Sequence, residues 1–206
     1  MANAARNLPR VGAQRPGGRA ARVRTDVLAA TAELLETVGY DELTYDEVAQ
    51  RAGVHRTTVY RRWPTKPELV ADAISVHSDG HVPIPETGSL RSDLRTFAFA
   101  VAANISSPGG ARRSRSIVAG AATSEQLAAR MNVLMTRRVA LAESILDQAA
   151  ARGEVAEDLD RRVYVEAVIA PIWFRLLLSG EPIDDTFLDA VVDLVTRAAV
   201  SSGHAT

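Results

Sequence analysis

The stretch that decides the fold is T-Y-D-E-V-A-Q-R-A-G-V-H-R-T-T-V-Y-R-R-W-P-T-K-P-E, residues 44–68. Within it, Ala49 offers a small side chain where a second helix would cross the first, and Gly53 tolerates the positive φ of a tight turn. Val59 supplies an apolar anchor on the second helix, facing back towards the first. The spacing Ala-x3-Gly-x5-Val therefore predicts a helix-turn-helix, and the basic run after it favours contact with DNA.

Two predicted helix starts in this stretch carry the same capping pattern. Thr44 with Glu47, and Thr65 with Glu68, match the capping box, in which a hydroxyl and a carboxylate satisfy unpaired N–H groups at the start of a helix. Pro67 suits a first helical turn because the N–H that proline lacks is not needed there. A plain helical hairpin is the alternative interpretation of the spacing, but the consecutive caps, turn and basic flank favour the helix-turn-helix.

Residues 20–70, about a quarter of the chain, resemble the DNA-binding domain of the TetR family of bacterial transcriptional regulators. The family pattern is an apolar first helix followed by T-x-x-x-[IV]-A-x-x-A-G-V-[S]-x-x-x-[LV]-Y-x-x-[FW]-x-[ST]-K-x-x-L. The chain matches this pattern at Thr44, Val48, Ala49, Ala52, Gly53, Val54, Val59, Tyr60, Trp63, Thr65, Lys66 and Leu69. It departs at His55, where the family more often has a small hydroxyl or acidic residue. The resemblance implies an all-α fold with an N-terminal three-helix head and a C-terminal helical bundle for ligand binding and dimerisation.

The second helix of the motif carries most of the candidate DNA contacts. An α-helix fits the major groove, where arginine reads guanine and a threonine methyl contacts thymine, so Arg56 and Thr57 are predicted to read bases. By the resemblance, Tyr60 and Lys66 contact phosphates, and Thr44 donates to a phosphate from the start of the preceding helix. The complete predicted set is Thr44, His55, Arg56, Thr57, Thr58, Tyr60, Arg61 and Lys66.

Two residues beside this helix are interpreted from their chemistry. Trp63 is predicted to lie in the core at the corner after the helix, where a buried indole would hold the helix in place. Lys66 is the only lysine of a chain whose Lys and Arg total 24. Because a compact ammonium and a planar guanidinium are not equivalent, we expect the geometry at residue 66 to require lysine, with chance retention as the alternative.

The net charge of −1 hides an uneven distribution. Residues 1–66 hold 11 Lys and Arg against 7 Asp and Glu, whereas residues 67–206 hold 13 against 18. The basic excess lies with the helix-turn-helix, as expected for a DNA-reading end and a DNA-avoiding end. The absence of cysteine excludes disulfides, thiolate metal ligands and a cysteine nucleophile. With no apolar run of membrane-spanning length and no apolar signal core, we expect a soluble, cytoplasmic protein without membrane contact.

The chain divides into three predicted parts. Residues 1–20 are rich in Gly, Pro and Arg, so we expect a disordered basic arm, either an exposed tail or an arm that reaches phosphates or the minor groove. Residues 21–66 form the helix-turn-helix domain and residues 67–206 the effector-binding and dimerisation domain. Helices of the last part are expected over 89–105, 111–122, 124–152, 160–179 and 184–201. Pro171 is predicted to kink or break the fourth of these helices.

The resemblance assigns two roles to the C-terminal part. Its last two helices are expected to pair with those of a second copy, so that two heads meet the half-sites of a palindromic operator about 34–36 Å apart. A cavity between its helices is expected to hold a small, mostly apolar effector, whose binding releases this homodimeric repressor from double-stranded DNA. The candidate lining residues, each with ordinary core as its alternative role, are Phe97, Phe99, Ile117, Met131, Leu134, Met135, Trp173 and Phe174.

Other functions have weaker support in the sequence. The chain lacks a Gly-rich phosphate loop, a G-x-S-x-G elbow and an H-E-x-x-H pair, so neither an enzyme nor a cofactor is expected. His77 and His81 have the i,i+4 spacing of a metal pair, but Gly80 and Pro83 favour fraying of that helix, and we expect no metal site. The alternative function is a DNA-binding adaptor with a helical interaction domain and no small-molecule ligand.

Overall fold

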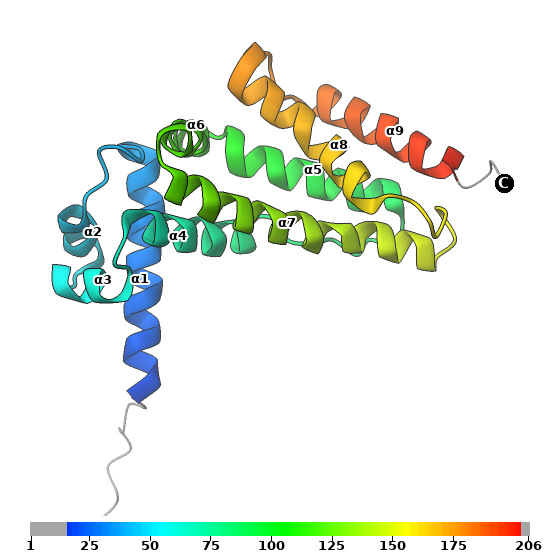
Figure 1. The fold of residues 1–206 in the computed structure, drawn as a ribbon. Helices are drawn as coiled ribbons and strands as arrows, with labels where there is room; N and C mark the ends of the chain where they lie inside the picture. The colour runs from blue at the N-terminus through cyan, green and yellow to red at the C-terminus, as the bar shows by residue number, and fades with distance from the viewer. Residues whose placement is uncertain (1–15, 203–206) are drawn as a thin grey trace, which may run out of the picture.

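A computed structural model of the chain describes the backbone of residues 16–202 and the side chains of residues 18–200 (Figure 1). The regular structure of this part is helical, without a strand, which confirms the predicted all-α fold. None of its helices is both long and apolar enough to cross a membrane. In chain order the helices are α1 (Pro16–Thr37), α2 (Tyr45–Ala52), α3 (Arg56–Arg62), α4 (Lys66–His81), α5 (Leu90–Ser106), α6 (Pro108–Thr123), α7 (Glu125–Ala151), α8 (Arg161–Phe174) with a π-helical turn (Arg175–Ser179), and α9 (Asp185–Ser202).

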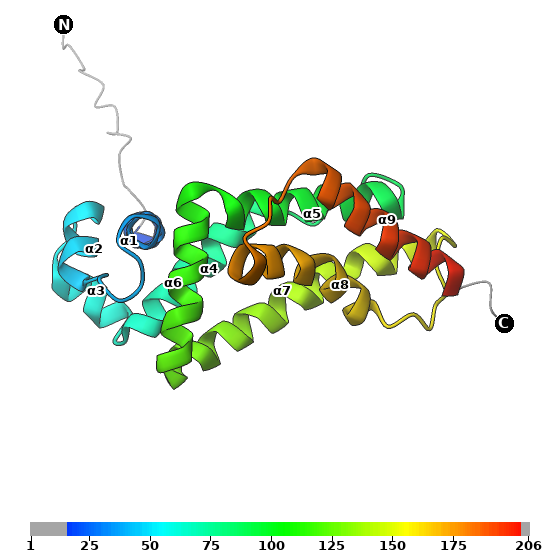
Figure 2. The same cartoon turned by 90° about the horizontal axis from the view of Figure 1, so that it is seen from above.

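We call α1–α3 the head and α4–α9 the body. Figures 1 and 2 show the head at one end of the molecule, with α9 running away from it towards the opposite end. In both views α6 stands between α1 and the long helices of the body, and it packs against α1, α5 and α7. This helix therefore touches both the head and the centre of the body.

The apolar core of the head is a single cluster to which every head helix contributes. Val27, Leu35, Val48 and Val59 from α1, α2 and α3 are fully buried in it, together with Leu69 from α4. The same cluster continues into the body through buried residues of α6 and α7, which are Ile117, Leu127, Met131 and Leu134. Because interiors pack densely, a shift of α6 or α7 changes the surroundings of the head core.

A second cluster fills the body between α5, α7, α8 and α9. Its fully buried members include Leu94, Ile145, Val168, Ile172 and Val192. They lie in the region where α5 packs against α9 and α7 packs against α8. Two apolar clusters thus meet along α6 and α7.

The structure departs from the predicted helix limits at the Pro- and Gly-containing segments. Residues 16–20, expected to be disordered, form the first helical turns of α1, whose first residue is a proline suited to that place; residues 1–15 of the predicted arm lie outside the described residues. The segment Pro108–Gly110 opens α6 instead of separating helices, because the Ser107 hydroxyl accepts from the Gly110 N–H at 3.2 Å. Around Pro171, α8 continues to Phe174 and then changes to the π-helical turn, so the predicted break lies just beyond the proline.

Candidate nucleic-acid interface and ligand cavity

The turn between α2 and α3 has the geometry that the sequence predicts. Gly53 adopts a left-handed conformation with φ of 66°, which suits a residue without Cβ, and its N–H donates to the carbonyl of Gln50 at 3.2 Å. The next N–H, of Val54, donates to the carbonyl of Ala49 at 3.0 Å, so the last carbonyls of α2 are satisfied. Ala49 and Val59 are both buried where the two helices meet.

Both predicted capping boxes are present. At the start of α2, the Thr44 hydroxyl accepts from the Glu47 N–H at 3.3 Å, and the Glu47 carboxylate accepts from the Thr44 N–H at 3.1 Å. Thr65 and Glu68 make the same reciprocal pair at the start of α4. The Thr44 hydroxyl also donates to Glu47 Oε2 at 2.7 Å, so a phosphate that accepted from this hydroxyl would have to replace the carboxylate.

The outer face of α3 presents a group of exposed polar and basic side chains. His55, Arg56, Thr57, Tyr60, Arg61 and Arg62 are exposed and Thr58 is half-buried, while Val59 alone on this helix is fully buried. Tyr60 is 56% exposed although its ring packs edge-on against Tyr45, with 5.7 Å between the centroids. This contact holds the tyrosine on the surface beside the arginines.

Among the described residues, Arg56 is held by one surface ion pair. Its Nη1 lies 3.3 Å from Oδ2 of Asp46 in the first turn of α2, and both side chains are more than half exposed. Exposed pairs of this kind contribute about 0–1 kcal/mol, so a stronger acceptor could displace the carboxylate at little cost.

Trp63 and Tyr45 fix α3 to its neighbours. Trp63 is buried, as predicted, and its Nε1–H donates to Asp72 Oδ2 of α4 at 2.9 Å. The Trp63 carbonyl accepts from the Tyr45 hydroxyl of α2 at 2.8 Å. Burial, with a smaller contribution from the charge of Glu68, raises the pKa of Tyr45 to about 12, so the phenol stays protonated and remains a donor. Both bonds tie the end of α3 to rigid helices.

Lys66 lies in a different environment from the one that the resemblance implied. Its ammonium donates to three backbone carbonyls of the α1–α2 loop, those of Tyr40 at 2.8 Å, Asp41 at 3.0 Å and Leu43 at 3.2 Å. It also lies 4.6 Å from the centre of the Tyr40 ring. An ammonium has three N–H donors, so these carbonyls can engage all of them in the chain without DNA. In this structure Lys66 holds the loop, and its phosphate contact stays a prediction.

A cavity of about 390 Å³ lies between α4, α5, α6, α7 and α8. Five of the predicted lining residues border it, namely Phe97, Ile117, Met131, Met135 and Trp173. Most of the remaining wall is apolar and consists of Ile74, Val82, Val101, Ile105, Val118, Ala121, Val139 and Ile169. Its volume lies in the lower part of the roughly 300–1,000 Å³ range typical of small-molecule sites.

Three predicted lining residues lie elsewhere. Phe99 packs beneath the Arg95 guanidinium, 4.1 Å from ring centre to Cζ, because two residues along an α-helix turn it about 200° away from Phe97. Phe174 follows Trp173 directly and is therefore rotated out of the cavity, with its ring 56% exposed. Leu134 is buried in the cluster shared with the head.

The polar part of the cavity wall was not predicted from the sequence. Its members are Ser78, Asn104, Arg113, Ser114 and Arg138. Arg113 belongs to the run A-R-R-S-R-S, which as a sequence is typical of a solvent-exposed helix face. In the structure Arg113 is only 3% exposed, and no pattern in the sequence distinguishes it from its exposed neighbour Arg112.

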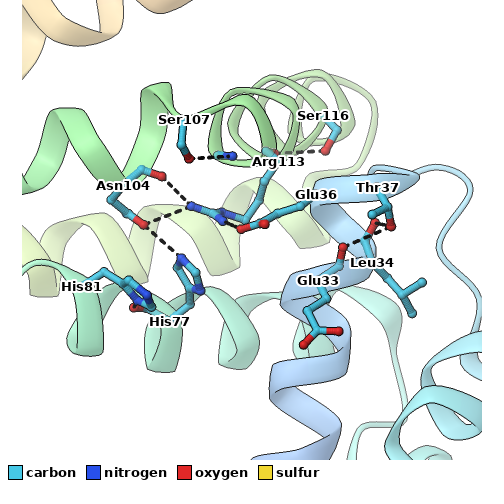
Figure 3. A network of polar contacts seen from close by, with 11 residues as sticks. Glu33, Leu34, Glu36, Thr37, His77, His81, Asn104, Ser107, Arg113 and Ser116 are labelled. Atoms are coloured by element: carbon cyan, nitrogen blue, oxygen red, sulfur yellow. Dashed lines mark hydrogen bonds and ion pairs between the residues drawn. The ribbon is translucent and has the colours of Figure 1, made fainter.

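Arg113 is the centre of a buried polar network that joins four helices (Figure 3). Its Nη1 donates to Glu36 Oε1 of α1, and its Nη2 donates to the carbonyl of Asn104 at 2.7 Å and to Asn104 Oδ1 at 3.0 Å. Nε2 of His77 on α4 lies 3.0 Å from the same amide oxygen. Burial lowers the pKa of Arg113, and the charge of Glu36 opposes this effect. The network therefore connects the cavity wall directly to the head.

His77 takes part in this network as a neutral donor. Burial is the main cause that lowers the pKa of His77 to about 4, and the charges of Arg113 and His81 act in the same direction. The rings of His77 and His81 are stacked with 4.1 Å between their centroids, and Nδ1 of His81 bonds to the His77 carbonyl at 2.7 Å. Within the described part of the chain, no three or more His, Cys, Asp and Glu side chains are grouped to hold a metal ion.

Two family models match the chain over these same regions. Residues 27–73 match the model described as bacterial regulatory proteins of the tetR family. Residues 84–195, more than half of the chain, match the model of a tetracyclin repressor-like C-terminal domain. The first match covers most of the head and the beginning of α4, and the second runs from just after α4 into α9.

Individual relatives extend over most of the chain. It is 37% identical over 157 residues to the HTH-type transcriptional regulator AqdR of Rhodococcus erythropolis, a match that covers 76% of this chain and 75% of AqdR. It is 33% identical over 174 residues to YdeS, an uncharacterised HTH-type transcriptional regulator of Bacillus subtilis, covering 84% and 85%. The crystal structure of the TetR family transcription regulator SCO0332 superimposes with a TM-score of 0.75 at 33% identity, covering 85% of this chain and 97% of SCO0332.

Proposed function

Since this chain belongs to the TetR family of bacterial transcriptional regulators, and is thus a DNA-binding regulator, we propose that it is a homodimeric repressor with a small-molecule effector. In this proposal residues 21–66 read DNA, residues 67–206 bind the effector and the second copy, and the basic segment 1–20 adds contacts to the DNA backbone. Repression is the common mode in the family and requires only that the bound dimer occupies the operator. Its place of action is the bacterial cytoplasm, where the operator lies.

The observation that carries the proposal is the exposed face of α3. Its polar and basic side chains point outward from a helix whose single buried anchor, Val59, and whose tethers through Tyr45 and Trp63 keep it rigid. A rigid, exposed helix with arginines and threonines has the size and chemistry that major-groove readout requires.

We assign the DNA contacts as follows. Arg56 and Thr57 read base edges in the major groove, with Arg56 exchanging its weak pair with Asp46 for a guanine. Tyr60 and Thr44 contact phosphates. The flanking residues His55, Thr58 and Arg61 complete the surface, whereas Lys66 supports it by holding the α1–α2 loop.

We assign dimerisation to α8 and α9. Five large apolar side chains are exposed on these helices and the π-helical turn, namely Val163, Phe174, Leu177, Leu178 and Leu194. Exposed apolar groups gathered on one helix pair are typical of an interface, and a second copy would bury them symmetrically. The dimer would place two heads on a palindromic operator at the spacing of about one helical turn, roughly 34–36 Å.

The cavity supports the small-molecule part of the proposal over the adaptor without a ligand. It is bordered mostly by apolar side chains and touches α4 and α6, both of which pack on α1. A compound that binds better to one arrangement of these helices shifts the population of head positions towards it. The released state is then one in which the two heads no longer match successive major grooves.

A mobility-shift experiment tests the DNA-binding part. The purified protein is titrated onto the intergenic DNA upstream of its own gene at several salt concentrations, beside the Arg56→Ala variant. Loss of one bidentate base contact costs about 1–3 kcal/mol, so we expect operator affinity to fall by roughly 5- to 150-fold. Arg137→Ala is the matched control, because Arg137 lies on α7, outside the proposed DNA and dimer surfaces, in an exposed pair with Asp79.

The outcomes separate the candidate functions. A sharp shift that Arg56→Ala weakens and Arg137→Ala preserves supports an operator-specific regulator, and compounds that abolish the shift identify effectors. An equal shift on unrelated DNA, or unchanged affinity of Arg56→Ala, contradicts the proposed readout. A specific shift that no cavity-binding compound releases favours the adaptor.

A further inference from the structure

The cavity wall carries positive charge and no negative charge. Its charged members among the described residues are Arg113 and Arg138, and no described aspartate or glutamate borders the cavity. The carboxylates that pair with these arginines, Glu36 for Arg113 and Asp79 for Arg138, lie behind the wall. The rest of the lining is mainly aliphatic, aromatic and thioether side chains. Such a wall suits a ligand with an apolar body and one anionic group.

Arg113 is better placed than Arg138 to receive that group. Its side chain is 4% exposed, compared with 13% for Arg138, so an ion pair with it would be screened less by water. The amide of Asn104 and the hydroxyl of Ser114 also border the cavity, and Asn104 already bonds to Arg113. The guanidinium can bind a planar carboxylate because its N–H donors form a rigid fork.

The carboxylate that already pairs with Arg113 belongs to the head. Glu36 lies in the last turn of α1, and its carboxylate fits against α6 at Gly109, where a Cβ would lie 2.6 Å from Glu36 Oε2. About three turns along the same face of α6, a Cβ at Gly120 would lie 2.5 Å from the ring of Tyr40 in the α1–α2 loop. The end of α1 and the loop after it therefore approach α6 through glycines, and Glu36 is the charged link across that contact.

We propose that the cavity binds an amphipathic carboxylic acid whose carboxylate pairs with Arg113, in competition with Glu36 of the head. This inference rests on the proposed effector-controlled regulation and specifies the chemistry of the effector. One guanidinium cannot give the same N–H groups to two carboxylates at once, so the ligand anion weakens the α1–α6 link. The ligand thereby has different affinities for the linked and unlinked arrangements, as any effector requires.

The test uses matched acids and amides as probes. Binding of 2-naphthoic acid and 2-naphthamide, and of decanoic acid and decanamide, is measured by isothermal titration calorimetry on the full chain near neutral pH without DNA. Each pair shares its apolar body and differs in the charge of its head group. We expect at least one acid to bind on the order of ten-fold more tightly than its amide, because the charged hydrogen bond is the stronger one.

Two variants test whether Arg113 binds the carboxylate of the acid and whether Glu36 competes with it. In Arg113→Met, affinity for the acid is expected to fall on the order of ten-fold, to the level of the amide, while affinity for the amide changes little. In Glu36→Gln, which removes the competitor, affinity for the acid is expected to rise several-fold, with the amide again unchanged. Circular dichroism verifies that each variant is folded. If Arg113→Met does not fold, Glu36→Gln still tests the competition.

One matched control lies one turn from Glu36 on α1, and a second lies on α7 beside Arg138. Glu33→Gln removes a carboxylate on α1 that pairs with Arg51, so it should leave both affinities unchanged. Arg137→Met removes an exposed arginine beside Arg138 that does not border the cavity. Arg138→Met tests whether Arg138, the second arginine of the cavity wall, binds the carboxylate instead.

The inference is overturned if neither acid binds, if amides bind as tightly as acids, or if Arg138→Met and not Arg113→Met removes the preference. Unchanged acid affinity in Glu36→Gln overturns the competition with the head. These readouts are independent of DNA, so a failure of the proposed repression is recognised separately, by acids that bind through Arg113 without altering the mobility shift. Release of DNA by neutral compounds alone contradicts the inference but agrees with the proposed function of an effector-controlled repressor.

Discussion

The ammonium of Lys66 organises the loop that precedes the DNA-reading helices. Three carbonyls converge on it, and burial lowers its pKa while Asp41 and Glu42 oppose that shift. A small, tetrahedral donor suits three acceptors arranged around one point, whereas a planar guanidinium does not. This geometry explains why the only lysine of an arginine-rich chain stands at this position.

Replacing Lys66 should therefore destabilise the fold even when the charge is kept. For Lys66→Arg we expect a loss of about 1–3 kcal/mol in the free energy of unfolding, because partly buried carbonyls lose their donor. Urea unfolding followed by circular dichroism measures this loss. Arg61→Lys, the reverse change at an exposed site on α3, should stay within about 0.5 kcal/mol. Equal stability of the two variants would show that the carbonyls do not need the ammonium.

His77 makes stability depend on pH. Its pKa is lowered to about 4 in the folded chain, mainly by burial, so the unfolded chain takes up a proton near pH 6.5 while the folded chain does not. The contribution of a neutral His77 is thus present above about pH 6.5 and is lost as the pH falls from there towards 4.

The variant His77→Gln tests that contribution. Glutamine retains an N–H donor for Asn104 and cannot titrate, so the melting temperature should fall less between about pH 6.5 and pH 4 than in the native chain. His55→Gln, at an exposed histidine on the head, should show the same fall in melting temperature over this pH range as the native chain. An equal fall in all three proteins would show that His77 is not its cause.

At the scale of helices, α6 packs closely against the end of α1 and the loop after it because two of its residues are glycines, which have no Cβ. Gly120 leaves room for the ring of Tyr40, and Gly109 for the carboxylate of Glu36. Helices that approach through glycines lie closer than helices with side chains between them. The distance between head and body is therefore sensitive to single added atoms at these positions.

Two glycine substitutions should have opposite effects. Gly120→Ala places a Cβ 2.5 Å from Tyr40 Cδ1, and such overpacking costs typically about 1–3 kcal/mol. Gly80→Ala on the exposed end of α4 meets nothing within 4 Å and should stabilise by about 0.5–1 kcal/mol, because alanine is the better helix former. Urea unfolding of both variants measures the signs. A stabilising Gly120→Ala would contradict the tight α6–α1 contact.

Helix limits illustrate how far local sequence determines an element. The capping boxes and Gly53 predict the starts of α2 and α4 and the end of α2, because a cap is formed by residues within one turn of each other. The start of α6 was missed because P-G-G is typical of a loop. There the Ser107 cap and the proline start a helix, and Gly110 avoids the carbonyl of Asn104, which a Cβ would approach to 2.3 Å.

For the whole molecule, the proposed dimer gives the exposed residues of α8 and α9 a partner. Leu194 is 62% exposed on α9, so Leu194→Glu should introduce a buried charge only if a second copy covers it. We expect light scattering after gel filtration to show a dimer for the native chain and a monomer for this variant, with weaker operator binding. Val133→Glu, at a residue 72% exposed on α7, should remain a dimer. A monomeric native chain would contradict the assigned interface.

Local sequence was enough to predict the helix-turn-helix, the all-α class and the burial of Trp63. These depend on capping residues, a left-handed glycine and apolar periodicity, which act between neighbours along the chain. It also selected five of the residues that border the cavity, because large apolar side chains at helical spacing turn inward.

The partners of the polar residues, in contrast, follow from how distant parts of the chain pack together. Lys66 meets carbonyls 23 to 26 positions away, and Arg113 meets Glu36 at a separation of 77. Helix rotation placed Phe97 in the cavity and Phe99 outside it. Such contacts depend on how distant helices pack, and packing is set by the fit of whole surfaces, which no local pattern of residues encodes.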